Sequence, residues 1–198
     1  VVLGLGLHGF LVLPLILLFV TRRKPHEYIR ALSPALLTAF STASSSATYP
    51  ITRECTIDGA GVDRKSADFV LPLGATINMD GTALYQAVAT VFIAQTLGLG
   101  LGLGAQLTII LTAVLASIGT AAVPGAGIIM LVIILESVGV PAAGIALILG
   151  VDRILDMCRT VVNVTGDCAV ATVVAASEGQ LGTPHLGGTD DRLRLSAG

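Results

Sequence analysis

The sequence predicts an all-α membrane protein. Its 198 residues are 54% hydrophobic and 12% charged, with a mean hydropathy of +0.87, whereas a soluble domain is about 45–50% apolar and about 25% charged. Several apolar stretches approach the length of about 20 residues that crosses a bilayer as a helix. One of them carries Asn78-Met79-Asp80-Gly81-Thr82 at its middle. Because a carboxylate there costs about 2.5–3.5 kcal/mol, this segment indicates a functional site.

The composition also limits the class of protein. A net charge of −2 gives no sign of a nucleic-acid partner. The three cysteines Cys55, Cys158 and Cys168 form no CxxC pair, so we expect neither a disulfide framework nor a thiolate metal site. Nothing indicates covalent chemistry, and we do not expect an enzyme. The chain begins within an apolar run and lacks the features of a signal peptide, which is typical of a fragment.

The first predicted transmembrane helix covers residues 1–20. It is apolar apart from His8, and Pro14 is the expected site of a kink. The basic residues of Thr21-Arg22-Arg23-Lys24 follow at once. Since positive charge beside a span marks the cytoplasmic side, this helix is expected to run from outside to inside.

Residues 27–61 and 105–139 are each predicted to form a re-entrant hairpin. The first has a hydroxyl-rich centre at 41–48, and the second is rich in Gly and Pro at 117–127. Such residues compete for backbone hydrogen bonds or stop helices. For 27–61, a Ser/Thr-rich helix interface is the alternative. The charge pattern places the first hairpin on the inner face and the second on the outer face, an arrangement that indicates a transport site near the midplane.

Residues 67–98 are predicted to form a broken transmembrane helix. Gly74 and Gly81 lie beside Pro72 in this stretch, and we expect the helix to unwind at Asn78–Gly81. Carbonyl groups freed by the break, together with the Asp80 carboxylate, can then hold a cation.

The last predicted span, residues 141–176, carries a polar stripe. The stripe repeats at intervals of three or four residues, which places its members on one helix face; these are Asp152, Asp156, Arg159, Asn163 and Asp167. It must face protein, water or ligand, because lipid would not solvate it. In the alternative interpretation, Asp156 and Arg159 only neutralise each other. Arg153 has no assigned role, and Asp152 is its candidate partner. Residues 179–198 are predicted to be a disordered cytoplasmic tail.

Four motifs occur in order: Ser44-Ser45-Ser46, Gly74 to Thr82, Ser117 to Gly127, and Asp156 to Asp167. Together they resemble the glutamate/aspartate transporter family, the dicarboxylate/amino acid:cation symporters. The resemblance implies that residues 1–178 are a partial transport domain, containing the sixth helix, the inner hairpin, the broken seventh helix, the outer hairpin and the eighth helix. It also implies a multi-pass protein of the plasma or inner cell membrane, and a homotrimer for the full-length protein.

The resemblance assigns three groups of sodium ligands. The first group contains the carbonyls of Gly74, Asn78 and Asn163 with the Asp167 carboxylate. The second group contains the carbonyls of Thr76, Ser117, Ile118 and Thr120. The third group contains the side chains of Asn78 and Asp80. Oxygen ligands of this kind suit a hard cation.

Substrate contacts are implied in the same way. They are the backbone at Ser45, Val123 and Gly127 and the side chains of Thr82, Asp156, Arg159, Thr160 and Asn163. Arg159 can grip a carboxylate bidentately, and Asp156 can take an ammonium group. Ala122 stands where the family more often has Gly.

The resulting expectation is a symporter of aspartate or glutamate that is coupled to sodium and works by alternating access. Two alternatives stay open. One is a proton-coupled glutamate or C4-dicarboxylate symporter of the same fold. The other is an ion channel or a non-transporting membrane fragment, since a polar stripe can also line a pore.

Overall fold

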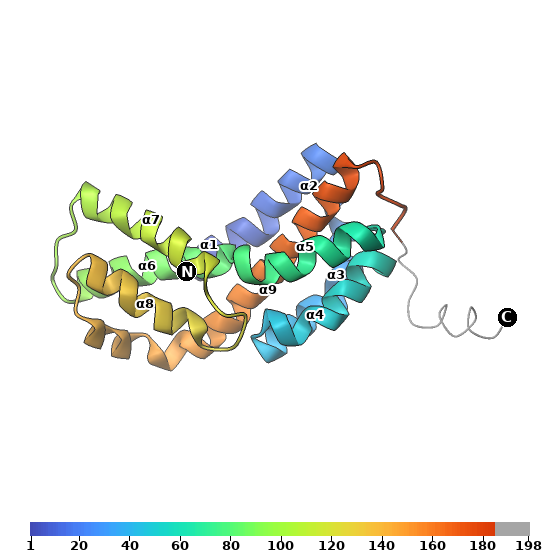
Figure 1. Ribbon diagram of the computed structural model, residues 1–198. Helices are drawn as coiled ribbons and strands as arrows, with labels where there is room; N and C mark the ends of the chain where they lie inside the picture. The colour runs from blue at the N-terminus through green and yellow to red at the C-terminus, as the bar shows by residue number, and fades with distance from the viewer. Residues whose placement is uncertain (185–198) are drawn as a thin grey trace.

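A computed structural model describes residues 1–184, and within them the chain is built from helices (Figure 1). The helices are α1 Val2–Leu7, α2 Leu13–Thr21, α3 Pro25–Thr42, α4 Ser45–Glu54, α5 Arg64–Ile77, α6 Asp80–Thr96, α7 Leu103–Ile118, α8 Ala126–Ser137 and α9 Leu149–Ser177. This confirms the all-α prediction. Of the tail predicted at 179–198, residues 185–198 lie outside the described part of the chain.

The first span is one continuous helix with a widened turn. A π-helical turn, His8–Val12, joins α1 to α2. The second residue of α2 is Pro14, which has no amide hydrogen to donate. The helix ends at Arg22, which adopts a left-handed conformation with φ 56° and donates its N–H to Leu18. Among the described residues, Val2–Thr21 and α9 are the two helices long and apolar enough to cross a bilayer.

Two helix pairs form hairpins. In the first, α3 and α4 pack together and are joined by Ala43 and Ser44; the Ser44 hydroxyl accepts the Ala47 N–H at 3.1 Å and so caps α4. In the second, α7 and α8 pack side by side (Figure 1). The tips of the hairpins meet, because the Ser44 hydroxyl donates to the Ala122 carbonyl at 2.8 Å and the Ser46 N–H donates to the same oxygen.

The helix break lies between α5 and α6. Only Asn78 and Met79 leave the helical conformation, with ψ values of 73° and 52°. Gly81 follows the break and lies directly against α9, where an added Cβ would be 2.8 Å from the Arg159 carbonyl oxygen. A residue without a side chain therefore lets the two backbones approach at this point.

Helix α9 is the centre of the arrangement. It packs against α2, α3, α5 and α6 (Figure 1), so its polar stripe faces protein. The predicted single helix at 141–176 is divided: a 3-10 helix, Ala142–Leu147, precedes α9. Gly144 in this turn packs closely against Ile93 of α6. This contact with α6 accompanies the interruption of the long helix.

The segment after α9 is fastened to the loop before α5. Val62 and Leu181 form an isolated antiparallel bridge, and the Gly182 N–H donates to the Gly61 carbonyl at 2.8 Å. The Arg23 guanidinium also donates to the Gly182 carbonyl. We refer to residues 181–184 as the strap.

Candidate functional site

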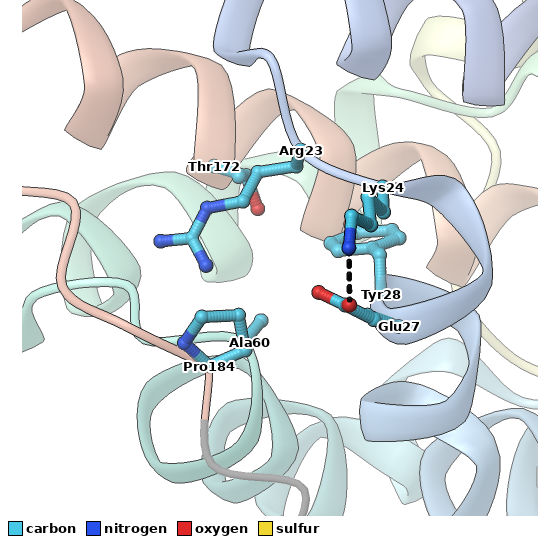
Figure 2. Close-up of a pocket in the computed structure, with 7 residues that line it drawn as sticks. All are labelled: Arg23, Lys24, Glu27, Tyr28, Ala60, Thr172 and Pro184. Atoms are coloured by element: carbon cyan, nitrogen blue, oxygen red, sulfur yellow. Dashed lines mark ion pairs between the residues drawn. The ribbon is translucent and has the colours of Figure 1, made fainter.

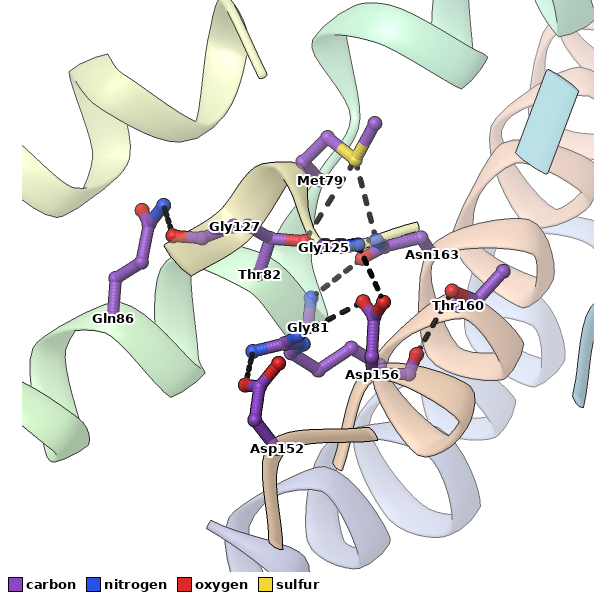
Figure 3. Close-up of polar contacts among 11 residues, drawn as sticks. Met79, Gly81, Thr82, Gln86, Gly125, Gly127, Asp152, Asp156, Thr160 and Asn163 are labelled. Atoms are coloured by element: carbon purple, nitrogen blue, oxygen red, sulfur yellow. Dashed lines mark hydrogen bonds and ion pairs between the residues drawn. The ribbon is translucent and has the colours of Figure 1, made fainter. Parts of the chain in front are cut away.

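The break in α5–α6 faces the middle of α9, and Asn163 joins them (Figure 3). Its side-chain oxygen accepts the Gly81 N–H at 2.8 Å, and its amide nitrogen donates to the Thr82 hydroxyl at 3.1 Å and to the Met79 sulfur at 3.3 Å. These contacts satisfy one of the N–H groups at the start of α6, which a helix start otherwise leaves unpaired. One amide thus fixes the local geometry of the break.

Asp167 lies one helical turn further along α9 and is 2% exposed. Asn78 donates its side-chain N–H to the Asp167 carboxylate at 3.1 Å. Gly74 is packed against the same carboxylate, since a Cβ at Gly74 would lie 2.6 Å from an Asp167 oxygen. The structure therefore gathers Gly74, Asn78 and Asp167 of the first predicted sodium group, and Asn163 lies on the same face of α9.

Asp80 has a partner that the sequence did not indicate. The His8 ring nitrogen Nε2 lies 2.8 Å from Asp80 Oδ2, joining the π-helical turn of the first span to the start of α6. Asn78 and Asp80 of the third predicted group both approach Gly166: a Cβ there would lie 2.7 Å from the Asn78 amide nitrogen and 3.3 Å from Asp80 Oδ2.

The residues of the second predicted sodium group differ in exposure. Helices α5 and α7 pack together, but Thr76 and Ile118 are exposed while Ser117 and Thr120 are buried. The hydroxyls of Thr76 and Ser117 each donate to a carbonyl of their own helix, and the Thr120 hydroxyl donates to the Ala116 carbonyl of α7.

Arg159 is the most deeply buried cation of the site and is 1% exposed. It donates to Asp152 at 3.2 Å and to Asp156 at 2.8 Å, and its guanidinium lies 3.7 Å from the centroid of the Tyr85 ring. Two carboxylates and an aromatic face therefore hold the cation. The expected pairing of Asp152 with Arg153 is wrong, because adjacent residues on a helix point about 100° apart whereas Asp152 and Arg159 share a face.

The tip of the outer hairpin closes over this ion pair. The second oxygen of Asp156 accepts the Gly125 N–H at 2.9 Å, and the Gly127 carbonyl accepts the Gln86 side chain at 3.3 Å (Figure 3). Gly127 also faces Arg159, since a Cβ there would lie 3.6 Å from the guanidinium carbon.

The predicted substrate residues are placed as follows. Thr82, Gly127, Asp156, Arg159 and Asn163 surround one region between α6, α8 and α9. Thr160 is buried, and its hydroxyl donates to the Asp156 carbonyl at 2.9 Å. Ser45 is buried at the inner tip, whereas Val123 is 52% exposed.

Several residues of the site were missed in the sequence. Tyr85 and Gln86 are both fully buried, and the Gln86 side-chain oxygen has no hydrogen-bond partner within residues 1–184. Their spacing was an available signal, because positions 82, 85 and 86 lie on one face of a helix. Asp152 was seen as part of the stripe but not as a partner of Arg159.

Comparison with known proteins identifies the family. The model of the sodium:dicarboxylate symporter family matches residues 1–177. The chain belongs to this family. The resemblance read from the four motifs is thereby confirmed.

Individual relatives agree with this assignment. Excitatory amino acid transporter 5 of Homo sapiens is 52% identical over 175 residues, which cover 88% of this chain and 31% of the relative. An excitatory amino acid transporter of Caenorhabditis elegans is 51% identical, covering 86% and 34%. Excitatory amino acid transporter 4 of Mus musculus is 49% identical, covering 94% and 35%. The chain spans about a third of the length of these relatives.

Proposed function

We propose that this chain is the substrate-binding part of a symporter that carries aspartate or glutamate with sodium by alternating access. The observation that carries the proposal is the buried Arg159, which donates to Asp156 at 2.8 Å beneath the tip of the outer hairpin. A guanidinium and a carboxylate within one helical turn offer a site for the side-chain carboxylate and the ammonium group of an acidic amino acid.

The ion pair neutralises two buried charges. An unpaired buried charge is strongly destabilising, so Arg159 and Asp156 satisfy each other. An acidic amino acid brings a side-chain carboxylate for Arg159 and an ammonium group for Asp156. When Asp156 turns to the substrate ammonium group, it would also release the Gly125 N–H. Substrate binding would in this way be coupled to the position of the outer hairpin.

For sodium, we propose that the ion binds at the helix break. Asp167 and the carbonyls of Gly74, Asn78 and Asn163 supply oxygen ligands, and Asn78 and Asp80 supply a second group. The carbonyls of Thr76, Ser117, Ile118 and Thr120 are proposed as a further group of oxygen ligands, because α5 and α7, which carry or adjoin these residues, pack together.

The test is uptake of labelled aspartate by cells that express a complete carrier in which this chain replaces the matching segment of human excitatory amino acid transporter 5. Saturable, concentrative uptake that disappears when lithium or choline replaces sodium is the expected result. Uptake that is undiminished when sodium is replaced would show that the proposed sodium sites are wrong. A conductance without concentrative uptake would favour a channel instead.

A proton-coupled symporter is the second candidate, and the contact between His8 and Asp80 favours it. A titratable ring at 2.8 Å from that carboxylate can exchange a proton with it. The same uptake assay separates the two candidates, because a proton-coupled carrier would respond to an imposed pH gradient in sodium-free medium.

The remaining features follow from the same proposal. We propose that α3–α4 and α7–α8 re-enter the membrane from opposite faces, that the protein lies in the plasma or inner cell membrane, and that the complete protein is a homotrimer. Cross-linking of the complete carrier in native membranes would test the trimer.

A further inference from the structure

The turn between α2 and α3 presents three consecutive cations that the transport proposal does not use. We refer to Arg22, Arg23 and Lys24 as the basic turn. Arg22 ends α2 in the left-handed conformation, and the Arg23 N–H donates to the Thr21 hydroxyl at 3.3 Å. The turn is therefore held in place by local hydrogen bonds, and it leaves Arg22 and Lys24 exposed.

The basic turn directly follows an exposed apolar helix face. Phe19 is 78% exposed and Val20 is 55% exposed, at the end of the apolar helix Val2–Thr21. Phe19 and Arg22 are three residues apart, which is about 4.5 Å along a helix axis. A membrane-spanning α2 would thus place its cations where the polar headgroups begin and its apolar face beside the acyl chains.

The charge at this point is only partly compensated. Lys24 lies 3.4 Å from Glu27, and His26 lies 3.9 Å from the same carboxylate. Arg23 donates to an uncharged carbonyl, that of Gly182. The Arg22 guanidinium makes no hydrogen bond or ion pair with the residues that the structure describes, although the Arg22 backbone N–H donates to Leu18. One carboxylate therefore faces three permanent cations, which leaves an excess of two positive charges.

A small hollow lies behind these cations (Figure 2). Its lining residues are Arg23, Lys24, Glu27, Tyr28, Ala60, Thr172 and Pro184. The Tyr28 side chain is buried, and its hydroxyl interacts with Thr172. Two cationic side chains, Arg23 and Lys24, thus line the hollow.

We propose that the basic turn binds the headgroup phosphate of one anionic phospholipid, whose acyl chains lie along the exposed apolar face at Phe19 and Val20. The phosphate oxygens accept charge-assisted hydrogen bonds from Arg22 and Lys24. The apolar face beside the cations favours a lipid over a free phosphate ion, because only a lipid covers both surfaces. Each cation near an anionic membrane surface strengthens binding about fivefold.

Native mass spectrometry of the chain, released from nanodiscs of phosphatidylcholine and phosphatidylserine, tests the proposal. The unaltered chain is expected to retain one phosphatidylserine in preference to phosphatidylcholine. The double variant Arg22→Gln with Lys24→Gln leaves the Arg23 contact to the strap in place and should lower this preference about 25-fold. The matched control is Arg64→Gln with Lys65→Gln, which removes two exposed cations from the start of α5.

The outcomes are distinct. Loss of the preference in the first double variant and its retention in the control would support the site. An equal loss in both would show attraction to overall charge and would overturn it. Displacement of the lipid by millimolar inorganic phosphate would overturn the assignment to a phospholipid.

A measurement on the unaltered chain covers the case in which a variant does not fold. Raising the salt concentration from about 0.1 M to about 1 M shortens the screening length from about 10 Å to about 3 Å. The preference for phosphatidylserine should then fall, and an unchanged preference would overturn the proposal.

Discussion

Gly74→Ala is the sharpest test of the proposed sodium site at Asp167. The added Cβ would lie 2.6 Å from an Asp167 oxygen and 3.0 Å from its carboxylate carbon. Neither distance is tolerated, so the carboxylate must move or α5 must shift. Overpacking of this kind costs about 1–3 kcal/mol, and the better helix propensity of Ala offsets at most about 1 kcal/mol of it.

The consequence should appear in sodium binding. If the carboxylate moves away from Asn78, the sodium affinity of the chain in nanodiscs falls about 5- to 150-fold, which corresponds to that strain. Titration with radioactive sodium, in the presence of aspartate, measures this change. The thermal unfolding midpoint should fall as well.

Gly6→Ala is the matched control. It lies within α1, and nothing is within 4 Å of the position of its added Cβ. This variant should keep its sodium affinity and gain slightly in stability from the helix propensity of Ala. If Gly74→Ala bound sodium as tightly as Gly6→Ala, the ligand role of Asp167 would be refuted.

Three further changes address other parts of the site. Arg159→Ala should abolish aspartate binding and spare some binding of neutral amino acids, as measured by competition; unchanged aspartate affinity would show that the substrate assignment is wrong. Ser44→Ala should cost about 0.5–2 kcal/mol of stability through loss of the α4 cap and should loosen the contact with Ala122, while Ser44→Thr should retain most of both; equal unfolding midpoints would contradict this. His8→Ala should raise the sodium affinity about tenfold by freeing Asp80 from a strong hydrogen bond, and a fall in affinity would assign His8 a supporting role at the site.

The sequence predicted the features that arise from local chemistry. A break was predicted at Asn78–Gly81 because an amide and a carboxylate interrupt an apolar stretch, and the structure limits it to Asn78 and Met79. The stripe on α9 was visible from its spacing. In both cases the polar residues have no favourable place in lipid, so composition and periodicity were sufficient to find them.

The partners of these residues depend on tertiary packing and could not be read from the chain. His8 and Asp80 are 72 positions apart, and only the packing of the first span brings them together. Tyr85 looked like any aromatic residue of an apolar helix until Arg159 was found against its ring. The division of 141–176 likewise depends on the contact of Gly144 with α6.

The strap has a consequence for how such a protein can move. Gly61 has φ 74°, and a Cβ there would lie 2.7 Å from the Thr183 carbonyl, so the fastening accepts no larger residue. It ties the end of α9 to the loop that leads into α5, while Asn78, directly after the other end of α5, donates to Asp167 within α9. Secured at both points, α5 and α9 would travel as one rigid block, and any hinge must lie elsewhere, in the connections to α7 and α8.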